Sequence, residues 1–143
     1  MQNKKIIIDS NVWSSLSMSK KLEDLEEIII KKSIVLLYSE KLVSEITGVI
    51  NRPKFRKYFA ENISELIIYF FKTYGILIHI TSNVLICRDT DDNFLLNLAV
   101  DGNADYLLTG DKDLLILEKI NNTKIISIAD FTAIFINQQI LTN

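Results

Sequence analysis

The chain has 143 residues, of which 48% are hydrophobic and 24% charged, with a formal net charge of −2. This length suits one domain with one core, and we expect residues 1–143 to form a single domain. The composition excludes a disordered chain, and no apolar run reaches the roughly 18 residues of a membrane helix. Asp9 ends the first apolar run too early for a signal peptide, and one cysteine, Cys87, excludes a disulfide framework or a cysteine-based zinc site. We therefore expect a cytoplasmic protein without a membrane partner.

The first half of the chain alternates between apolar strands and amphipathic helices. In order, the predicted elements are a strand at 4–9, a helix at 11–31, a strand at 33–38, a helix from 40 to about 51, and helical segments at roughly 54–60 and 63–73. Leucines and isoleucines recur on one face of these helices. Ser39 is placed to cap the helix that follows it, and Pro53 helps to end that helix.

The second half continues the alternation. The predicted elements are a strand at 75–80, a helix from about 91 to 101, a strand at 105–110, a helix at 112–119, a strand at 123–128 and a helix at 129–139. Short apolar strands separated by helices predict a parallel sheet that is covered on both faces. We therefore expect an α/β protein, a three-layer α/β/α sandwich with a central, mostly parallel sheet of about five strands. Open sheets of this kind bind ligands beyond the carboxyl ends of their strands.

Acidic residues occupy the positions where such a site is expected. Asp9 ends the first strand, and Asp111 and Asp113 follow the fourth strand in the stretch TGDKD. Helical spacing places Glu45 beside the apolar face of its helix and Asp92 at the head of a buried stripe. Each acid alone is also explained as a turn residue or a helix N-terminus. Packed carboxylates repel one another unless they hold a cation, and oxygen ligands without histidine or cysteine suit magnesium or manganese.

Four stretches of the chain resemble the PIN domain, a nuclease domain. They are IIIDSNVWSSL at 6–16, YSEKLVSEITGVINRPKF at 38–55, RDTDDNFLLNLAVDGNADYLLTGDKDLL at 88–115, and IISIADF at 125–131. The third stretch is the most specific, because an acid, a helix, a strand and TGDKDLL occur in register. Within the family the chain is most similar to the VapC-like ribonucleases, the toxin components of toxin–antitoxin systems. The family often reads DPDD where this chain has Asp89, Thr90, Asp91 and Asp92, which removes no carboxylate.

The resemblance implies a function and a set of site residues. The implied catalytic and metal-binding acids are Asp9, Glu45, Asp92 and Asp111, with Asp113 as a further metal ligand. Asn11 and Thr109 match polar positions that orient ligands or phosphate. The implied reaction is hydrolysis of RNA phosphodiester bonds by an endoribonuclease that uses one or two Mg²⁺ or Mn²⁺ ions. The implied partners are RNA, a cognate antitoxin and a second copy of the chain in a homodimer.

The stretch RPKFRK, residues 52–57, concentrates positive charge directly after the helix that carries Glu45. The candidate nucleic-acid contacts are Arg52, Lys54, Arg56 and Lys57. Such residues hold phosphates while Phe55 stacks or packs, but a solvated helix end with Phe55 in the core explains the same stretch. We expect His79, in a predicted strand, to be structural, and Cys87 to be a buried apolar residue rather than a nucleophile.

Three alternative functions compete with a nuclease. A magnesium-dependent phosphatase needs a second acid two residues after the first, where this chain has Asn11. A receiver domain needs a phosphorylatable aspartate after the third strand, where Thr81 and Ser82 stand. A catalytically silent PIN-like scaffold that binds RNA or protein would have lost the acids, and this sequence keeps all of the four that the resemblance implies.

Overall fold

The centre of the protein is a six-stranded sheet in the order β3-β2-β1-β4-β6-β5. The computed structural model describes residues 3–59 and 61–134. The strands are β1 (Lys4–Ile8), β2 (Ile34–Tyr38), β3 (Gly75–Leu77), β4 (Tyr106–Leu108), β5 (Lys119–Ile120) and β6 (Thr123–Ile126). All neighbours pair in parallel except β5, which is antiparallel to β6. The predicted α/β class with a mostly parallel sheet is confirmed, and β5 is an addition to it.

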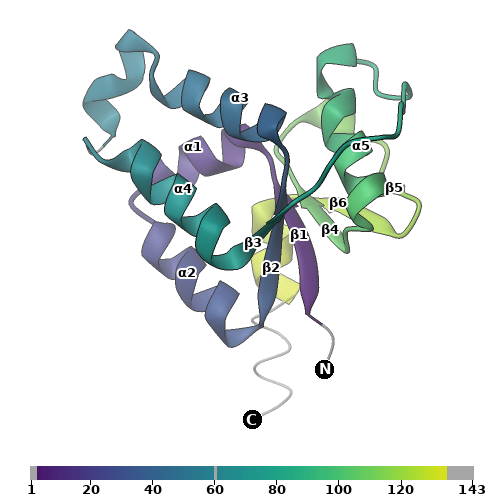
Figure 1. Ribbon diagram of the computed structural model, residues 1–143, viewed down its shortest axis with the longest axis horizontal. Helices are drawn as coiled ribbons and strands as arrows, with labels where there is room; N and C mark the ends of the chain where they lie inside the picture. Colours follow the sequence, from purple (N-terminus) through teal and green to yellow (C-terminus); the bar gives the residue numbers. More distant parts are fainter. Residues whose placement is uncertain (1–2, 60, 135–143) are drawn as a thin grey trace.

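Helices cover both sides of this sheet. The helices are α1 (Ser10–Met18), α2 (Leu22–Lys31), α3 (Glu40–Ile50), α4 (Ile63–Tyr74), α5 (Asn93–Gly102) and α6 (Lys112–Leu115). Helices α1 to α4 lie on one side of the central strands and α5 on the other (Figure 1). The chain steps from β1 to β2 and β3 in one direction and then crosses back to β4, on the far side of β1. Right-handed crossovers move the connecting helix to the opposite face at such a reversal, so β1 and β4 flank the switch point of the sheet.

The predicted helix over 11–31 is two helices in the structure. Lys20 has a φ of 59°, in the left-handed region, and ends α1. The backbone N–H groups of Lys20 and Lys21 donate to the carbonyls of Ser17 and Leu16, at 3.3 and 2.9 Å. This pair of bonds is a Schellman motif, which closes a helix by satisfying its last carbonyls. The apolar periodicity continues through α2 because each of the two helices buries an apolar face in the core, so periodicity alone did not reveal the break.

Several other predicted elements are shorter in the structure. The predicted strand 75–80 ends at Leu77, so His79 lies outside the strand and is exposed, contrary to the prediction. The predicted helix 112–119 ends at Leu115, because Glu118 takes a φ of 63° before β5 begins. Residues 128–134 are helical, and the remainder of the predicted helix 129–139 lies outside the described residues.

Two short 3-10 helices, η1 (Pro53–Tyr58) and η2 (Thr90–Asp92), stand where longer helical segments were predicted to begin. A 3-10 helix of six residues thus precedes α4, and one of three residues precedes α5. The turn η2 matters for the site, because it sets the entry of the chain into α5.

The core fixes the strand ends that carry the acids. The three isoleucines of β1 are all buried, because helices cover both faces of this central strand. Trp13 of α1 is fully buried and meets the rings of Phe70 and Phe71 edge-on, with ring centroids 5.6 and 5.2 Å away. This contact locks α1 against α4, and with it the turn at Asp9 that joins β1 to α1.

Candidate functional site

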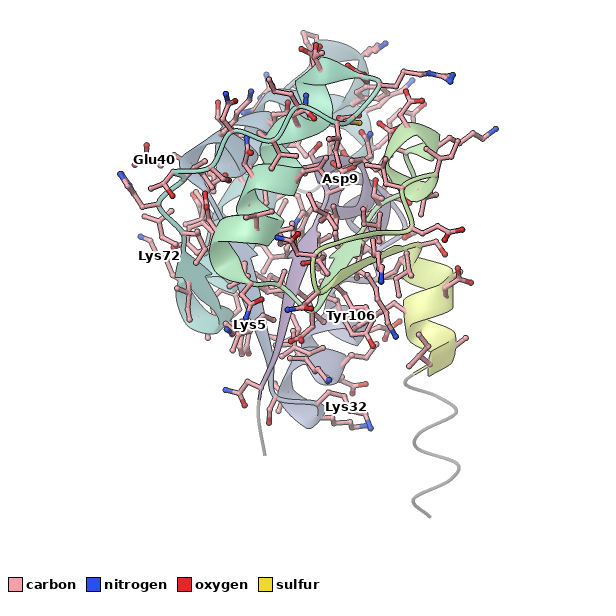
Figure 2. All side chains as sticks on the ribbon, turned by 90° about the vertical axis from the view of Figure 1, so that its right-hand side faces the viewer. Lys5, Asp9, Lys32, Glu40, Lys72 and Tyr106 are labelled. Carbon is pink, nitrogen blue, oxygen red and sulfur yellow. The ribbon has the colours of Figure 1, made fainter. Side chains whose placement is uncertain are left out.

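The carboxyl ends of β1 and β4 bring Asp9 and Thr109 together at the switch point. Figure 2 shows Asp9 at the end of β1 that is remote from Lys5. The hydroxyl of Thr109 donates to Asp9 Oδ2 at 2.7 Å and accepts from the backbone N–H of Asp111 at 3.0 Å. Thr109 is fully buried and Asp9 is 4% exposed. One hydroxyl therefore ties the acid after β1 to the acid after β4.

Helix α3 contributes a second acid beside Asp9. Glu45 is half-buried between the buried residues Leu42 and Ile46, as its helical spacing predicted. The hydroxyl of Ser10 lies 3.3 Å from Asp9 Oδ1 and 3.5 Å from Glu45 Oε2. Ser10 is buried and was not predicted as a site residue; its only signal in the sequence was a hydroxyl directly after Asp9.

Burial acts on both of these carboxyl groups. It raises the pKa of Asp9, and the hydrogen bonds from Thr109 and Ser10 oppose this rise. Burial also raises the pKa of Glu45, with a further contribution from the negative charge of Asp9. The two acids thus lie in an environment that disfavours two free negative charges.

The entry into α5 supplies a third group of carboxylates. One carboxylate oxygen from each of Asp89, Asp92 and Asp111 lies within 4.8 Å of the others. Asp89 caps the turn η2 by accepting the backbone N–H of Asp91 at 3.1 Å, and this turn directs Asp92 inward while Asp91 stays exposed. Asp89 was not among the predicted site residues. Its signal in the sequence was its position three residues before Asp92. Because a regular helix was expected to begin at about residue 91, Asp89 was placed before that helix and was not considered as part of its buried face.

Asp92 has the most unfavourable environment of these acids. Its burial and its contacts with Asp111 raise its pKa to about 8. Its Oδ2 atom is buried and has no hydrogen-bond partner within the described residues. A buried carboxylate oxygen without a partner costs free energy, which a bound cation would recover. Because the surrounding donors are carboxylate oxygens, the residues present fit a hard divalent cation such as Mg²⁺ or Mn²⁺.

Asp9, Glu45 and Asp92 open onto one cavity of about 360 Å³, whereas Asp89 and Asp111 are not among the residues that line it. Its polar lining comes from Asp9, Ser10, Asn11, Glu45, Arg52 and Asp92. Four of the predicted site residues and the predicted nucleic-acid contact Arg52 therefore face the same space. Arg52 follows the last turn of α3 and is the only basic residue that lines the cavity within the described part of the chain.

Other predicted residues lie elsewhere. The predicted nucleic-acid contacts Lys54, Arg56 and Lys57 are exposed on η1 and do not line the cavity. Phe55 is half-buried, which decides neither for a ring that stacks on nucleic acid nor for a core residue. Asp113 is outside the group formed by Asp89, Asp92 and Asp111, and its Oδ1 atom lies 3.6 Å from Arg88 Nε.

The thiol of Cys87 lies near these acids but takes the role that the sequence predicted. Cys87 is 4% exposed, and its Sγ atom lies 3.7 Å from the carbonyl oxygen of Asp113. Burial raises the pKa of this thiol, so the reactive thiolate is disfavoured. The interpretation of Cys87 as a buried apolar residue is confirmed.

Comparisons with known proteins show which family the chain is related to. A family model described as "PIN domain" matches residues 5–113, a range that includes Asp9, Glu45, Asp92 and Asp111. The uncharacterized protein MJ1680 of Methanocaldococcus jannaschii is 35% identical over 130 residues, which cover 82% of this chain and 81% of the relative. Among the residues that the structure describes, no helix has the length and apolar character needed to cross a membrane.

Proposed function

The chain belongs to the PIN domain family, and from this premise we propose that it is a metal-dependent endoribonuclease that hydrolyses RNA phosphodiester bonds. PIN domains are generally metal-dependent nucleases. The observation that carries the proposal is the convergence of Asp9, Glu45 and Asp92 on one cavity, with Asp111 beside Asp92. Isolated structural acids would not meet from four separate segments at the switch point of the sheet.

In this proposal the cation ligands are Asp9, Glu45, Asp92 and Asp111. When bound, a divalent cation offsets the charge that develops on the phosphate and makes water a stronger nucleophile. Thr109 holds the Asp9 carboxylate in one orientation through its 2.7 Å hydrogen bond, and Ser10 spans Asp9 and Glu45. These hydroxyls limit the freedom of the ligands, which is the usual role of residues behind a metal site.

Proton transfer in the proposed site rests on the acids. Asp92 holds its proton more tightly than an ordinary aspartate, so a cation bound there would compete with that proton for the carboxyl group. His79 is exposed beyond β3 and does not line the cavity. We therefore assign no catalytic proton transfer to His79. Asn11, which lines the cavity, is proposed to orient the substrate phosphate or a water molecule.

A polyanionic substrate is proposed because positive charge adjoins the cavity, and the resemblance to VapC-like ribonucleases selects RNA. Arg52 lines it, and the exposed residues Lys54, Arg56 and Lys57 continue from Arg52 along η1. Exposed basic residues along a surface bind a phosphate backbone without reading its sequence. This arrangement supports binding of a polyanion across the rim of an acidic cavity.

Cleavage of a labelled single-stranded RNA with and without Mg²⁺ or Mn²⁺ tests the proposal. We expect cleavage with either ion, none in EDTA, and none with Asp9→Asn. RNA binding that is insensitive to EDTA, with no product under any condition, would instead indicate the silent scaffold. Release of phosphate from small phosphate esters would indicate the phosphatase.

We further propose that the nuclease is the toxin component of a toxin–antitoxin system, acts as a homodimer and is inhibited by a small antitoxin. The sequence resemblance to VapC-like ribonucleases motivates this part. Expression of the chain alone should slow bacterial growth, and Asp9→Asn should relieve the inhibition. Equal inhibition by the two proteins would contradict the toxin role.

A further inference from the structure

The extended segment before the site, residues 81–88, is hydrogen-bonded to a row of side chains on α5. Three residues one helical turn apart, Asn93, Asn97 and Asp101, accept backbone N–H groups from this segment. The donors are Thr81 and Ser82 to Asp101 at 2.8 and 3.1 Å, Val84 to Asn97 at 2.6 Å, and Cys87 to Asn93 at 2.9 Å. The segment is therefore held along the length of the helix and delivers Arg88 to a fixed place.

Arg88 lies at the rim of the acid group. It directly precedes Asp89, and its Nε atom is 3.6 Å from Asp113 Oδ1. Asp113 is held in turn, because its backbone N–H donates to Asp111 Oδ1 at 2.9 Å. The guanidinium is thus linked through Asp113 to one of the proposed cation ligands.

The stability of the fold does not account for this position of Arg88. The Arg88 side chain is 78% exposed and that of Asp113 36% exposed. An ion pair in such an exposed setting contributes only about 0–1 kcal/mol. The contact uses Nε and most of the side chain is exposed, so the guanidinium remains accessible to a ligand.

The negative charge of the cavity indicates why a cationic side chain near it would serve to bind a phosphate group. The carboxylates of Asp9 and Glu45 repel an approaching phosphate chain, and cationic side chains at the rim offset this repulsion. Arg52 supplies one at the end of α3, where it lines the cavity, and Arg88 supplies another beside Asp113, directly before Asp89. Helices α3 and α5 lie on opposite sides of the sheet (Figure 1). An accessible planar guanidinium matches the paired oxygens of a phosphate group.

We propose that Arg88 binds a phosphate of the RNA backbone next to the one that is cut, and that Asp113 orients its guanidinium. This inference rests on the proposed nuclease function. It gives Asp113 a positioning role through Arg88, in place of the role as a cation ligand that the sequence resemblance implied.

Binding of a fluorescein-labelled single-stranded RNA in EDTA, measured by anisotropy over a series of KCl concentrations, tests the role of Arg88. Arg88→Gln should weaken binding roughly tenfold and reduce the slope of log K against log salt concentration by about 0.7. Arg88→Lys should keep the slope and regain only part of the affinity. The control Lys124→Gln makes the same charge change at the exposed amino end of β6 and should alter neither quantity.

An Arg88→Gln protein with the same affinity and salt slope as Lys124→Gln would overturn the proposal. Thermal melting of each variant checks that the fold is intact. With Mg²⁺, Arg88→Gln should raise KM while kcat stays within about threefold. Absence of cleavage by the unmodified protein would refute the proposed nuclease function, whereas the binding measurement in EDTA would still decide the role of Arg88.

Asp113→Asn tests the positioning role separately. RNA binding should weaken in the otherwise unmodified chain but not in the Arg88→Gln background, because Asp113 acts through Arg88. The affinity for Mn²⁺, measured by calorimetry without RNA, should remain unchanged. A loss of Mn²⁺ affinity would overturn this part and return Asp113 to the set of cation ligands.

Discussion

The two ends of α5 hold aspartates in opposite environments. At the C-terminal end, burial alone would raise the pKa of Asp101, but hydrogen bonds from the backbone and hydroxyls of Thr81 and Ser82 outweigh it and hold the pKa below its ordinary value. At the N-terminal end, burial and contacts with Asp111 raise the pKa of Asp92 to about 8. The Asp101 carboxylate accepts hydrogen bonds that hold a neighbouring segment in place. The Asp92 carboxylate has a buried oxygen that finds no hydrogen-bond partner among the described residues.

This difference reverses what the helix dipole predicts. A helix N-terminus favours a negative charge and a C-terminus disfavours it, by about 0.3–1 kcal/mol. In this protein the immediate neighbours outweigh the dipole at both ends. Satisfaction of hydrogen bonds therefore separates a structural aspartate from a functional candidate better than position on the helix does.

Removing one carboxylate at each end gives the largest expected contrast in activity. Asp92→Asn should lower RNA cleavage at least about a hundredfold, because a cation ligand affects activity at least as strongly as a residue that supports one. Asp101→Asn should leave kcat within about threefold, because the hydrogen bonds of Asp101 within the described residues come from Thr81 and Ser82, in the segment before the site. Initial rates in saturating Mg²⁺ provide the measurement, and equal losses in the two variants would contradict the comparison.

The hydroxyl that links the acids should have the next largest effect. Thr109→Val keeps the shape of the buried side chain but removes the bonds to Asp9 and to the N–H of Asp111. Cleavage should fall about tenfold to a hundredfold, as for other residues that orient metal ligands. Thr109→Ser restores the hydroxyl and should recover most of the rate; a valine variant as active as the serine variant would contradict the orienting role.

The stabilities should change in the opposite order to the activities. Asp101→Ala removes the acceptor of several bonds and should lower the free energy of unfolding by about 1–3 kcal/mol. Asp92→Asn removes a disfavoured charge and should raise that free energy at pH 8 in EDTA. Urea unfolding of both variants measures this, and a destabilised Asp92→Asn would contradict the assignment of strain to Asp92.

A further expected effect is a difference in pH dependence without metal. The raised pKa of Asp92 gives a contribution to stability that is complete below its ordinary pKa of 3.8 and is lost as the pH rises to about 8. The lowered pKa of Asp101 gives a contribution that is present above that ordinary value and is lost as the pH falls through the lowered pKa. Urea unfolding in EDTA across this range should show a decline toward pH 8 that Asp92→Asn reduces; an unchanged decline would contradict the account.

Rules that concern residues close together in the chain predicted much of the fold. Strand ends and helical spacing placed Asp9, Glu45 and Asp92 correctly relative to the core, because side-chain periodicity follows directly from backbone geometry. The strand order has a reversal, as is usual in such sheets, so a switch point was to be expected, although the sequence did not say which strands would flank it.

Features that depend on contacts between distant segments were not foreseeable. Ser10 bridges Asp9 and Glu45 only because α1 and α3 pack side by side. The row of α5 side chains that holds the segment before Arg88 appears in the sequence as polar residues on a helix, a pattern that usually means a solvated face. In both instances the sequence shows the polar residue but not the distant group to which it is hydrogen-bonded, because spacing along the chain does not identify that group.

The affinity for Mn²⁺ tests the central claim most directly, because it concerns the cation site itself. Calorimetric titration of the unmodified chain, Asp92→Asn and Asp101→Asn should show binding in the first and third proteins and a loss of at least about tenfold in the second. Equal affinity in all three proteins, or no binding by the unmodified chain, would contradict a cation site at the carboxyl ends of β1 and β4.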